Sequence, residues 1–167
     1  MNLYLRLIWM LLGAWRKPRL GPADKAVLRS IVFPLDLDLN MHMNNGRYLT
    51  LLDLGRIEMM IRLGFVPAIR KYKWNPVVGA QKIAFLKALG PFQRFEIHSR
   101  VLGWDEKWLY FHQTFEADGD VYAEAVIKTI FLSPEGRVPS AELMRSIGAD
   151  GPSPRIPPKL IQGLSKT

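Results

Sequence analysis

Residues 36–56 read DLDLNMHMNNGRYLTLLDLGR, and this stretch passes from acidic and amide residues into a long apolar pattern. The apolar residues of 48–63 follow helical spacing, and the Gly64 that comes next is typical of a helix end. Asn44 or Asn45 lies where the helix would begin, and Asn is favoured at that position. The stretch therefore predicts a polar turn followed by one helix apolar enough to be largely enclosed.

Segments on both sides of this helix alternate apolar and polar residues, which is typical of half-buried strands. They are residues 27–40, 75–89, 91–105, 107–117 and 121–137. Within the first of them, an extended backbone would point Asp36 and Asp38 to the same side. Strands grouped apart from a single helix indicate an α+β fold, in which a curved antiparallel sheet packs against that helix.

Composition limits the classes of function. The 167 residues suit one domain, and 49% of them are hydrophobic, which is enough for a sizeable core. The absence of cysteine excludes disulfides, Cys zinc sites and thiol nucleophiles, and favours a reducing, cytoplasmic location. A formal charge of +8 favours an anionic partner, but the basic residues are scattered, so nucleic acid is not favoured. No His or carboxylate cluster is spaced with His42, so we expect no metal site.

The chain divides by composition into residues 1–22, residues 23–148 and a Pro- and Gly-rich arm at 149–167. The first segment carries an apolar run too short for the roughly 20 residues of a spanning helix. As a helix, it would gather Leu3, Leu7, Met10, Leu11 and Ala14 on one face. Two alternatives stay open. The helix packs on the protein's own core or on a subunit, or residues 1–17 attach to the inner face of a membrane through aromatic and basic side chains.

The polar turn and the helix after it carry a recognisable signature. The pattern Asp36-x-Asp38-x-x-x-His42-x-Asn44-Asn45-x-x-Tyr48, followed by Arg56, resembles that of the hotdog-fold acyl-CoA thioesterases, in particular the 4-hydroxybenzoyl-CoA thioesterase-like branch. The likeness covers about residues 27–148, and the N-terminal apolar segment is similar to that of membrane-associated members. Met41 stands where the pattern usually has Gly, which puts in doubt the close backbone approach that Gly permits.

The resemblance implies a hotdog fold, in which a curved antiparallel β-sheet wraps around one long central helix. It implies a hydrolase of lipid metabolism that converts acyl-CoA or acyl carrier protein thioesters to free acid and thiol. No cofactor is implied, because coenzyme A is part of the substrate. Subunits of such proteins join sheets edge to edge with active sites between them, so we expect a homodimer or homotetramer.

The resemblance also implies roles for individual residues. Asp38 maps onto the catalytic acid, as base or nucleophile, with His42 in support and the backbone of Asn45 or its neighbour as oxyanion donor at the positive end of the helix. The substrate-binding residues would be Asn44, Tyr48, Met59 and Lys87. Each has a structural alternative: Asp38 as a turn residue, His42 as a hydrogen bonder within the turn, Asn44 and Asn45 as helix caps, Tyr48 at a subunit interface, Met59 as core and Lys87 as a solvated surface charge.

Other readings of the motif stay open. The protein could be a non-catalytic hotdog module that binds acyl-CoA or lipid at a membrane surface. A hotdog dehydratase or hydratase fits the motif poorly. Arg56 is expected to pair with an acid such as Asp53, across a subunit boundary or within one helix.

Overall fold

The computed structural model describes residues 2–164. Its elements in chain order are α1 Asn2–Ala14, β1 Ala26–Ile31, the 3-10 helix η1 Pro34–Asp36, α2 Asn45–Leu63, α3 Phe65–Tyr72, β2 Asn75–Phe85, β3 Arg94–Trp104, β4 Leu109–Ala117, β5 Asp120–Ser133, β6 Gly136–Val138, α4 Ser140–Arg145 and α5 Pro158–Ile161. Residue 1 of the predicted N-terminal segment and residues 165–167 of the predicted arm lie outside the described residues.

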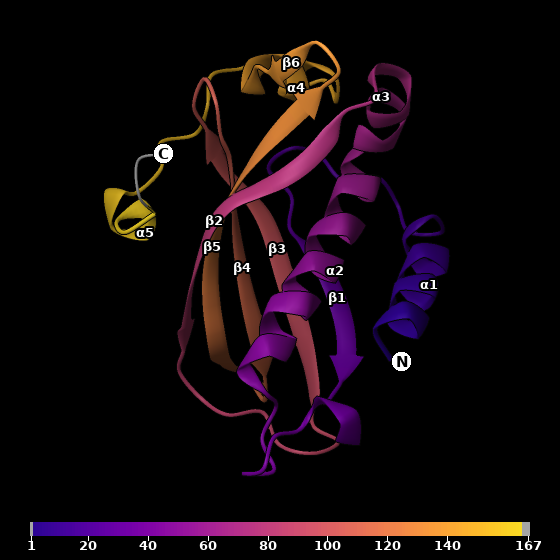
Figure 1. The fold of residues 1–167 in the computed structure, drawn as a ribbon, viewed down its shortest axis with the longest axis vertical. Helices are drawn as coiled ribbons and strands as arrows, with labels where there is room; N and C mark the ends of the chain where they lie inside the picture. The colour runs from indigo at the N-terminus through magenta and orange to yellow at the C-terminus, as the bar shows by residue number, and fades with distance from the viewer. Residues whose placement is uncertain (1, 165–167) are drawn as a thin grey trace.

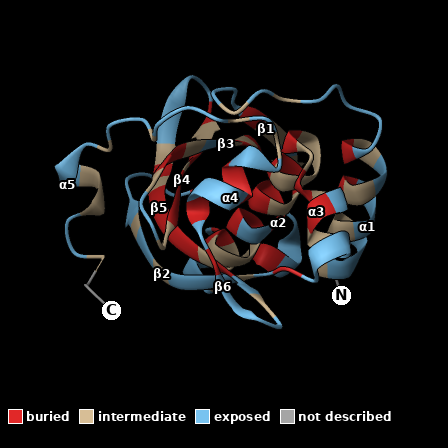
Figure 2. Cartoon of the chain, turned by 90° about the horizontal axis from the view of Figure 1, so that it is seen from above, coloured by how far each residue is buried: buried red, intermediate tan, exposed pale blue. Residues whose placement is uncertain are grey.

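One antiparallel sheet curves around α2 (Figure 1). Its strand order is β1-β3-β4-β5-β2, and β6 pairs with the end of β5. β1 and β2 are therefore the two edges of the sheet. Figure 2 shows the buried residues of the sheet and of α2 facing each other. The predicted α+β fold, a curved antiparallel sheet around one long central helix, is confirmed.

The ends of α2 follow the predicted signals. The side chain of Asn44 caps the helix, since its Oδ1 accepts a hydrogen bond from the Gly46 N–H at 2.9 Å. Gly64 ends the helix with φ 88°, a left-handed conformation that glycine adopts without a Cβ clash. Between these ends, Leu51, Leu52 and Met59 are fully buried in the core.

The close approach of α2 to the sheet depends on Gly55. A Cβ at this position would lie 2.9 Å from Ile97 Cγ2 and 3.0 Å from both Gln113 Nε2 and Ser99 Oγ. The buried Gln113 amide donates to the Leu52 carbonyl at 3.0 Å and to Ser99 Oγ at 2.8 Å. The helix is thereby hydrogen-bonded to the floor of the sheet at the point where its backbone comes nearest.

α1 is part of this core. Met10 and Ala14 are buried, and Leu3, Leu7 and Leu11 pack against the same cluster, so the predicted apolar face and its packing on the protein's own core are confirmed. Basic side chains of this segment also cover the free edge of β1: Arg6 Nη2 donates to the Ile31 carbonyl at 2.9 Å, and Lys17 Nζ to the Val27 carbonyl at 3.2 Å. Within residues 2–164, no helix has the length and apolarity needed to cross a membrane.

The strand predicted over 27–40 is wrong beyond Ile31. Pro34 starts the 3-10 helix η1, in which Asp36 is buried, and Asp38 lies half-buried in the turn that follows. The two aspartates therefore do not project from the same side of one strand. The short helices α3, α4 and α5 were not predicted, because each has eight residues or fewer and shows too little of a helical period.

The C-terminal arm lies across the outer face of its own sheet. Ile156, Leu160, Ile161 and Leu164 pack over a small second cluster of Leu102, Tyr110 and Val126. The Trp104 N–H donates to Ser153 Oγ at 2.7 Å, which fixes the start of the arm on β3.

We expect Gly55→Ala to lower the free energy of unfolding by about 1–3 kcal/mol, because the added methyl group overpacks the contact with the sheet. Gly13→Ala is the matched control. No atom lies within 4 Å of a Cβ built at Gly13, so this change should raise the free energy of unfolding by up to about 1 kcal/mol through helix propensity. Urea unfolding followed by circular dichroism measures both. Equal effects of the two changes would refute the close approach at Gly55.

Candidate functional site

The signature residues form a compact turn between η1 and α2. The turn closes on itself, since the Asp38 N–H donates to the His42 carbonyl at 2.8 Å and Leu37 forms an antiparallel bridge with Met43. It is also fixed to the loop after β2, because the Met43 N–H donates to the Leu89 carbonyl at 2.8 Å. The turn therefore lies at the end of the sheet where the edge strand β2 finishes, toward the lower end of Figure 1.

The two carboxylate oxygens of Asp38 have different surroundings. Oδ1 accepts hydrogen bonds from the Asn40 N–H at 2.9 Å and the His42 N–H at 3.3 Å, so it shapes the turn. No residue within 2–164 donates a hydrogen bond to Oδ2. Oδ1 thus acts as a turn acceptor, which was the structural alternative for Asp38. Oδ2 remains available to water or a ligand.

The backbone conformation of Met41 explains why the family pattern has Gly at this position. Its φ of 59° is left-handed, a conformation that costs a residue with a Cβ about 1 kcal/mol or more. Gly at this position would relieve that strain. The Met41 side chain is itself 58% exposed, so it points largely into solvent and does not fill the turn. Met in place of Gly therefore strains the backbone at residue 41, but the turn still closes.

The start of α2 leaves one N–H group available. Asn44 satisfies two of the first donors: its side chain accepts from the Gly46 N–H, and its carbonyl accepts from the Arg47 N–H at 2.8 Å. The Asn45 N–H belongs to the first helical residue, which has no partner inside the helix, and no other residue of 2–164 accepts from it. An unpaired donor at the positive end of a helix dipole favours negative charge.

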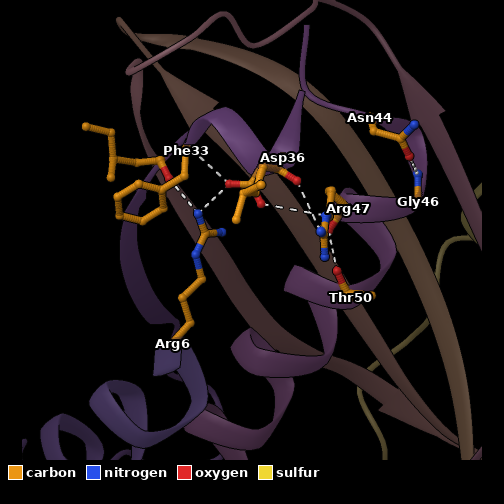
Figure 3. Close-up of polar contacts among 9 residues, drawn as sticks. Arg6, Phe33, Asp36, Asn44, Gly46, Arg47 and Thr50 are labelled. Carbon is orange, nitrogen blue, oxygen red and sulfur yellow. Dashed lines mark hydrogen bonds and ion pairs between the residues drawn. The ribbon is translucent and has the colours of Figure 1, made fainter. Parts of the chain in front are cut away.

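A buried ion-pair cluster supports the turn from behind (Figure 3). The Asp36 carboxylate is only 1% exposed and is paired with Arg6 from α1. It also accepts from the Phe33 N–H at 2.9 Å and lies 3.7 Å from Arg47 Nε of α2. The Asp36 carbonyl in turn accepts from the Asn44 N–H at 2.8 Å. The cap residue of α2 is thus held by the same residue that joins α1 to α2.

Sequence reasoning missed the contribution of Arg6. The only signal was one arginine that interrupts an otherwise apolar run. A charge on the inward side of an apolar helix needs a buried partner, and that partner is Asp36, 30 residues further along the chain.

The other predicted site residues lie in different surroundings. Tyr48 is buried, its ring meets those of Phe85 and Phe115 edge-on, and its hydroxyl accepts from the Leu89 N–H at 3.4 Å. Burial raises the pKa of Tyr48. Met59 is buried deep in the core, well along α2 from the turn. The structure thus brings Asp38, His42, Asn44 and Asn45 together, with Tyr48 one layer beneath.

Two charged residues lie outside the turn. Lys87 is exposed, and its ion pair with Asp120 at 2.5 Å raises the pKa of the lysine. Arg56 pairs with Asp53 inside α2 and donates to Gln113 Oε1 at 3.1 Å, so the pairing within one helix is the one observed in this chain. Burial lowers the pKa of Arg56.

Two cavities lie near α2, and the signature turn lines neither. A groove of about 780 Å³ separates α1 from β1; its walls include Trp9, Met10 and Arg29. A recess of about 250 Å³ opens between α2 and the edge strand β2, beside Met60 and Val78. Within residues 2–164, no three His, Asp or Glu side chains are grouped to hold a metal ion.

Comparison with known proteins gives consistent matches. A family model described as the thioesterase-like superfamily matches residues 32–164. Protein THEM6 of Danio rerio is 34% identical over 125 residues, which are 74% of this chain and 62% of that protein, so the chain spans less than two thirds of this relative's length.

Solved structures share the fold. The crystal structure of YbaW, a probable thioesterase from Escherichia coli, has a TM-score of 0.69 at 19% identity and covers 74% of this chain and 97% of its own. That of Slr0204, a 1,4-dihydroxy-2-naphthoyl-CoA thioesterase from Synechocystis, has a TM-score of 0.65 at 10% identity and covers 76% of this chain and 97% of its own. At these identities the likeness confirms the hotdog fold.

We expect Arg6→Ala to lower the free energy of unfolding by about 3 kcal/mol, because it leaves the buried Asp36 carboxylate without its nearest cation. Arg29→Ala is the control, because it removes an ion pair with Glu96, at 2.8 Å, that lies on the surface. This change should lower the free energy of unfolding by less than about 1 kcal/mol. Denaturant unfolding of both variants provides the comparison. If Arg6→Ala costs no more than Arg29→Ala, then Asp36 does not depend on α1.

Proposed function

The chain belongs to the thioesterase-like superfamily, and on that premise we propose that it hydrolyses acyl-CoA or acyl carrier protein thioesters to a free acid and a thiol. One observation carries the proposal: Asp38 Oδ2 and the Asn45 N–H of α2 belong to one short turn, and neither has a hydrogen-bond partner among residues 2–164. A thioester needs a base or nucleophile and a group that stabilises the oxyanion. The turn offers both.

Two routes use the same atoms. As a base, Asp38 Oδ2 takes a proton from water, and the hydroxide attacks the thioester carbon. As a nucleophile, Oδ2 attacks that carbon itself and forms an anhydride that water then cleaves. In both routes the carbonyl oxygen gains negative charge, which the Asn45 N–H and the helix dipole stabilise. The C–S bond then breaks, and the thiolate leaves as the thiol after it receives a proton.

His42 supports this chemistry by position. Its backbone N–H donates to Asp38 Oδ1 and so helps to fix the carboxylate in the turn. His42 is exposed, and its proposed role is to orient a water molecule or the acyl group.

The proposed substrate-binding residues act at different depths. Asn44 shapes the helix tip, and Lys87 presents a charge that suits the phosphates of coenzyme A. Tyr48 and Met59 are buried, so their proposed role is to form the apolar wall beneath the acyl group.

We propose that two copies pair through β2. β2 pairs with β5 on one side only, and Val77, Val78 and Phe85 on it are exposed. The other edge, β1, is covered by Arg6 and Lys17. An uncovered strand edge is a template for a second strand. Because the signature turn is bonded to the loop after β2, a partner on this edge would lie beside Asp38 and complete the site, in a homodimer or in a homotetramer of such pairs.

We expect Asp38→Asn to reduce thioester hydrolysis by about 100-fold or more. An Asn side chain keeps an oxygen for the Asn40 and His42 N–H groups, so the turn should persist, but it lacks the anionic oxygen. The assay is release of free thiol from a panel of aliphatic and aryl acyl-CoAs and acyl carrier proteins. Asp24→Asn is the matched control, because the Asp24 carboxylate also accepts a backbone N–H, that of Gly21 at 2.7 Å, far from the turn.

Each outcome of this assay has a clear meaning. Full activity in Asp38→Asn would refute the role of Asp38. Tight binding of acyl-CoA without hydrolysis of any panel member would favour the non-catalytic binding module instead.

Val78→Lys should weaken self-association by at least about tenfold, since it places like charges on both sides of the proposed β2 contact. Phe92→Lys is the control, because Phe92 is also exposed and its N–H donates to the Val32 carbonyl at 3.0 Å, next to β1 at the opposite edge of the sheet. Sedimentation equilibrium gives the association constants. A wild-type monomer, or equal constants for both variants, would rule out pairing through β2.

A further inference from the structure

α1 is apolar on two opposite faces, and the core covers only one of them. The uncovered side chains, which we call the outer face of α1, are Tyr4, Leu5, Ile8, Trp9, Leu12 and Trp15. Each is between 50% and 75% exposed. A helix that is apolar on all sides is normally buried, so we expect the outer face to be covered by a binding partner.

The outer face is large. With about 200 Å² of surface for each aromatic side chain, its three aromatic residues alone expose on the order of 400 Å². That value already lies within the range of the largest apolar patches on monomeric proteins, before the three aliphatic residues are added. Figures 1 and 2 both place α1 at the outside of the molecule, on the side opposite β2, so the proposed subunit contact leaves this face open.

The charges beside the outer face have one sign. Residues 1–23 contain four basic residues and no acidic one. Arg6 and Lys17 are engaged with Asp36 and Glu58, whereas Arg16 and Arg19 are exposed just beyond the end of α1. Two copies meeting through this face would bring like charges together, but an anionic lipid surface complements them.

α1 is already ordered for such a contact. Near its start, Arg6 joins it to Asp36, and just past its end, Lys17 pairs with the buried Glu58 at 3.0 Å. Glu58 also pairs with Arg62 at 3.2 Å, and Arg62 Nε donates to the Pro18 carbonyl at 3.1 Å. The helix therefore needs no coupled folding on contact. At 13 residues it is about 20 Å long and lies along the molecule, as an interfacial helix lies along a bilayer.

We propose that the outer face of α1 docks the protein on the surface of an anionic bilayer. Trp9, Trp15 and Tyr4 lie at the boundary between headgroups and acyl chains, where amphipathic aromatic rings are favoured. Leu5, Ile8 and Leu12 reach deeper, and Arg16 and Arg19 face the headgroup phosphates. This docking does not depend on hydrolysis, because it uses no residue of the Asp38 turn.

The test is co-sedimentation of the full chain with phosphatidylcholine vesicles that contain or lack phosphatidylglycerol. We expect binding to the anionic vesicles, and a drop of about tenfold or more in the partition coefficient for Trp9→Gln with Trp15→Gln. Val121→Gln with Leu132→Gln is the matched control, because both residues are exposed apolar side chains of β5, which two strands separate from β1 and α1, and it should bind as the wild type does. Arg16→Glu with Arg19→Glu should remove the preference for anionic vesicles.

Three results would overturn the proposal. The first is wild-type protein that stays in solution with both kinds of vesicle, or binds both equally. The second is a tryptophan variant that sediments like the control. The third is loss of an oligomer in the tryptophan variant without vesicles, measured by sedimentation velocity, since the outer face would then be covered by another copy of this chain.

Discussion

The arrangement of the signature turn depends on one buried charge, the carboxylate of Asp36. A carboxylate this deeply buried is tolerated only with cations and N–H groups around it. The partners that meet this demand come from separate parts of the chain: Arg6 from α1, the Phe33 N–H just before η1, and Arg47 from the first turn of α2. Satisfying Asp36 therefore sets where α2 begins, and with it where the Asn45 N–H points.

The two aspartates of the motif, Asp36 and Asp38, have different surroundings. Asp36 is enclosed and joins α1 to α2, whereas Asp38 lies half-buried, and within residues 2–164 only its Oδ1 accepts hydrogen bonds. A single residue can thus satisfy the turn and still offer a charged atom to a ligand. Asn44 also has two roles. Its side chain accepts from the Gly46 N–H and its carbonyl from the Arg47 N–H, but it does not accept from the Asn45 N–H.

Sequence patterns predicted the features that arise from nearby residues. The extent of α2, its Asn44 cap and Gly64 end, the sheet strands and the inner face of α1 all follow from spacing within one element. The end of β1 at Ile31 was missed because apolar and polar residues go on alternating in the sequence through η1, where the backbone is no longer extended. The Arg6–Asp36 pair and the bond from Arg56 to Gln113 were out of reach, since their partners lie 30 and 57 residues apart and meet only in the folded chain. The motif predicts Asp38 as the catalytic acid, which stays a prediction, and the hydrogen bonds within residues 2–164 show that Oδ1 is the oxygen engaged in the turn.

The covering of β1 by α1 has a consequence for how far assembly can proceed. A sheet with two open edges can add chains at both ends and grow without limit. Here Arg6 and Lys17 occupy two carbonyls of the β1 edge, which disfavours the addition of a strand there and leaves β2 as the more open edge. In the proposed pair, the joined sheet would end on each side in a β1 strand covered by α1, which would limit its growth beyond two subunits.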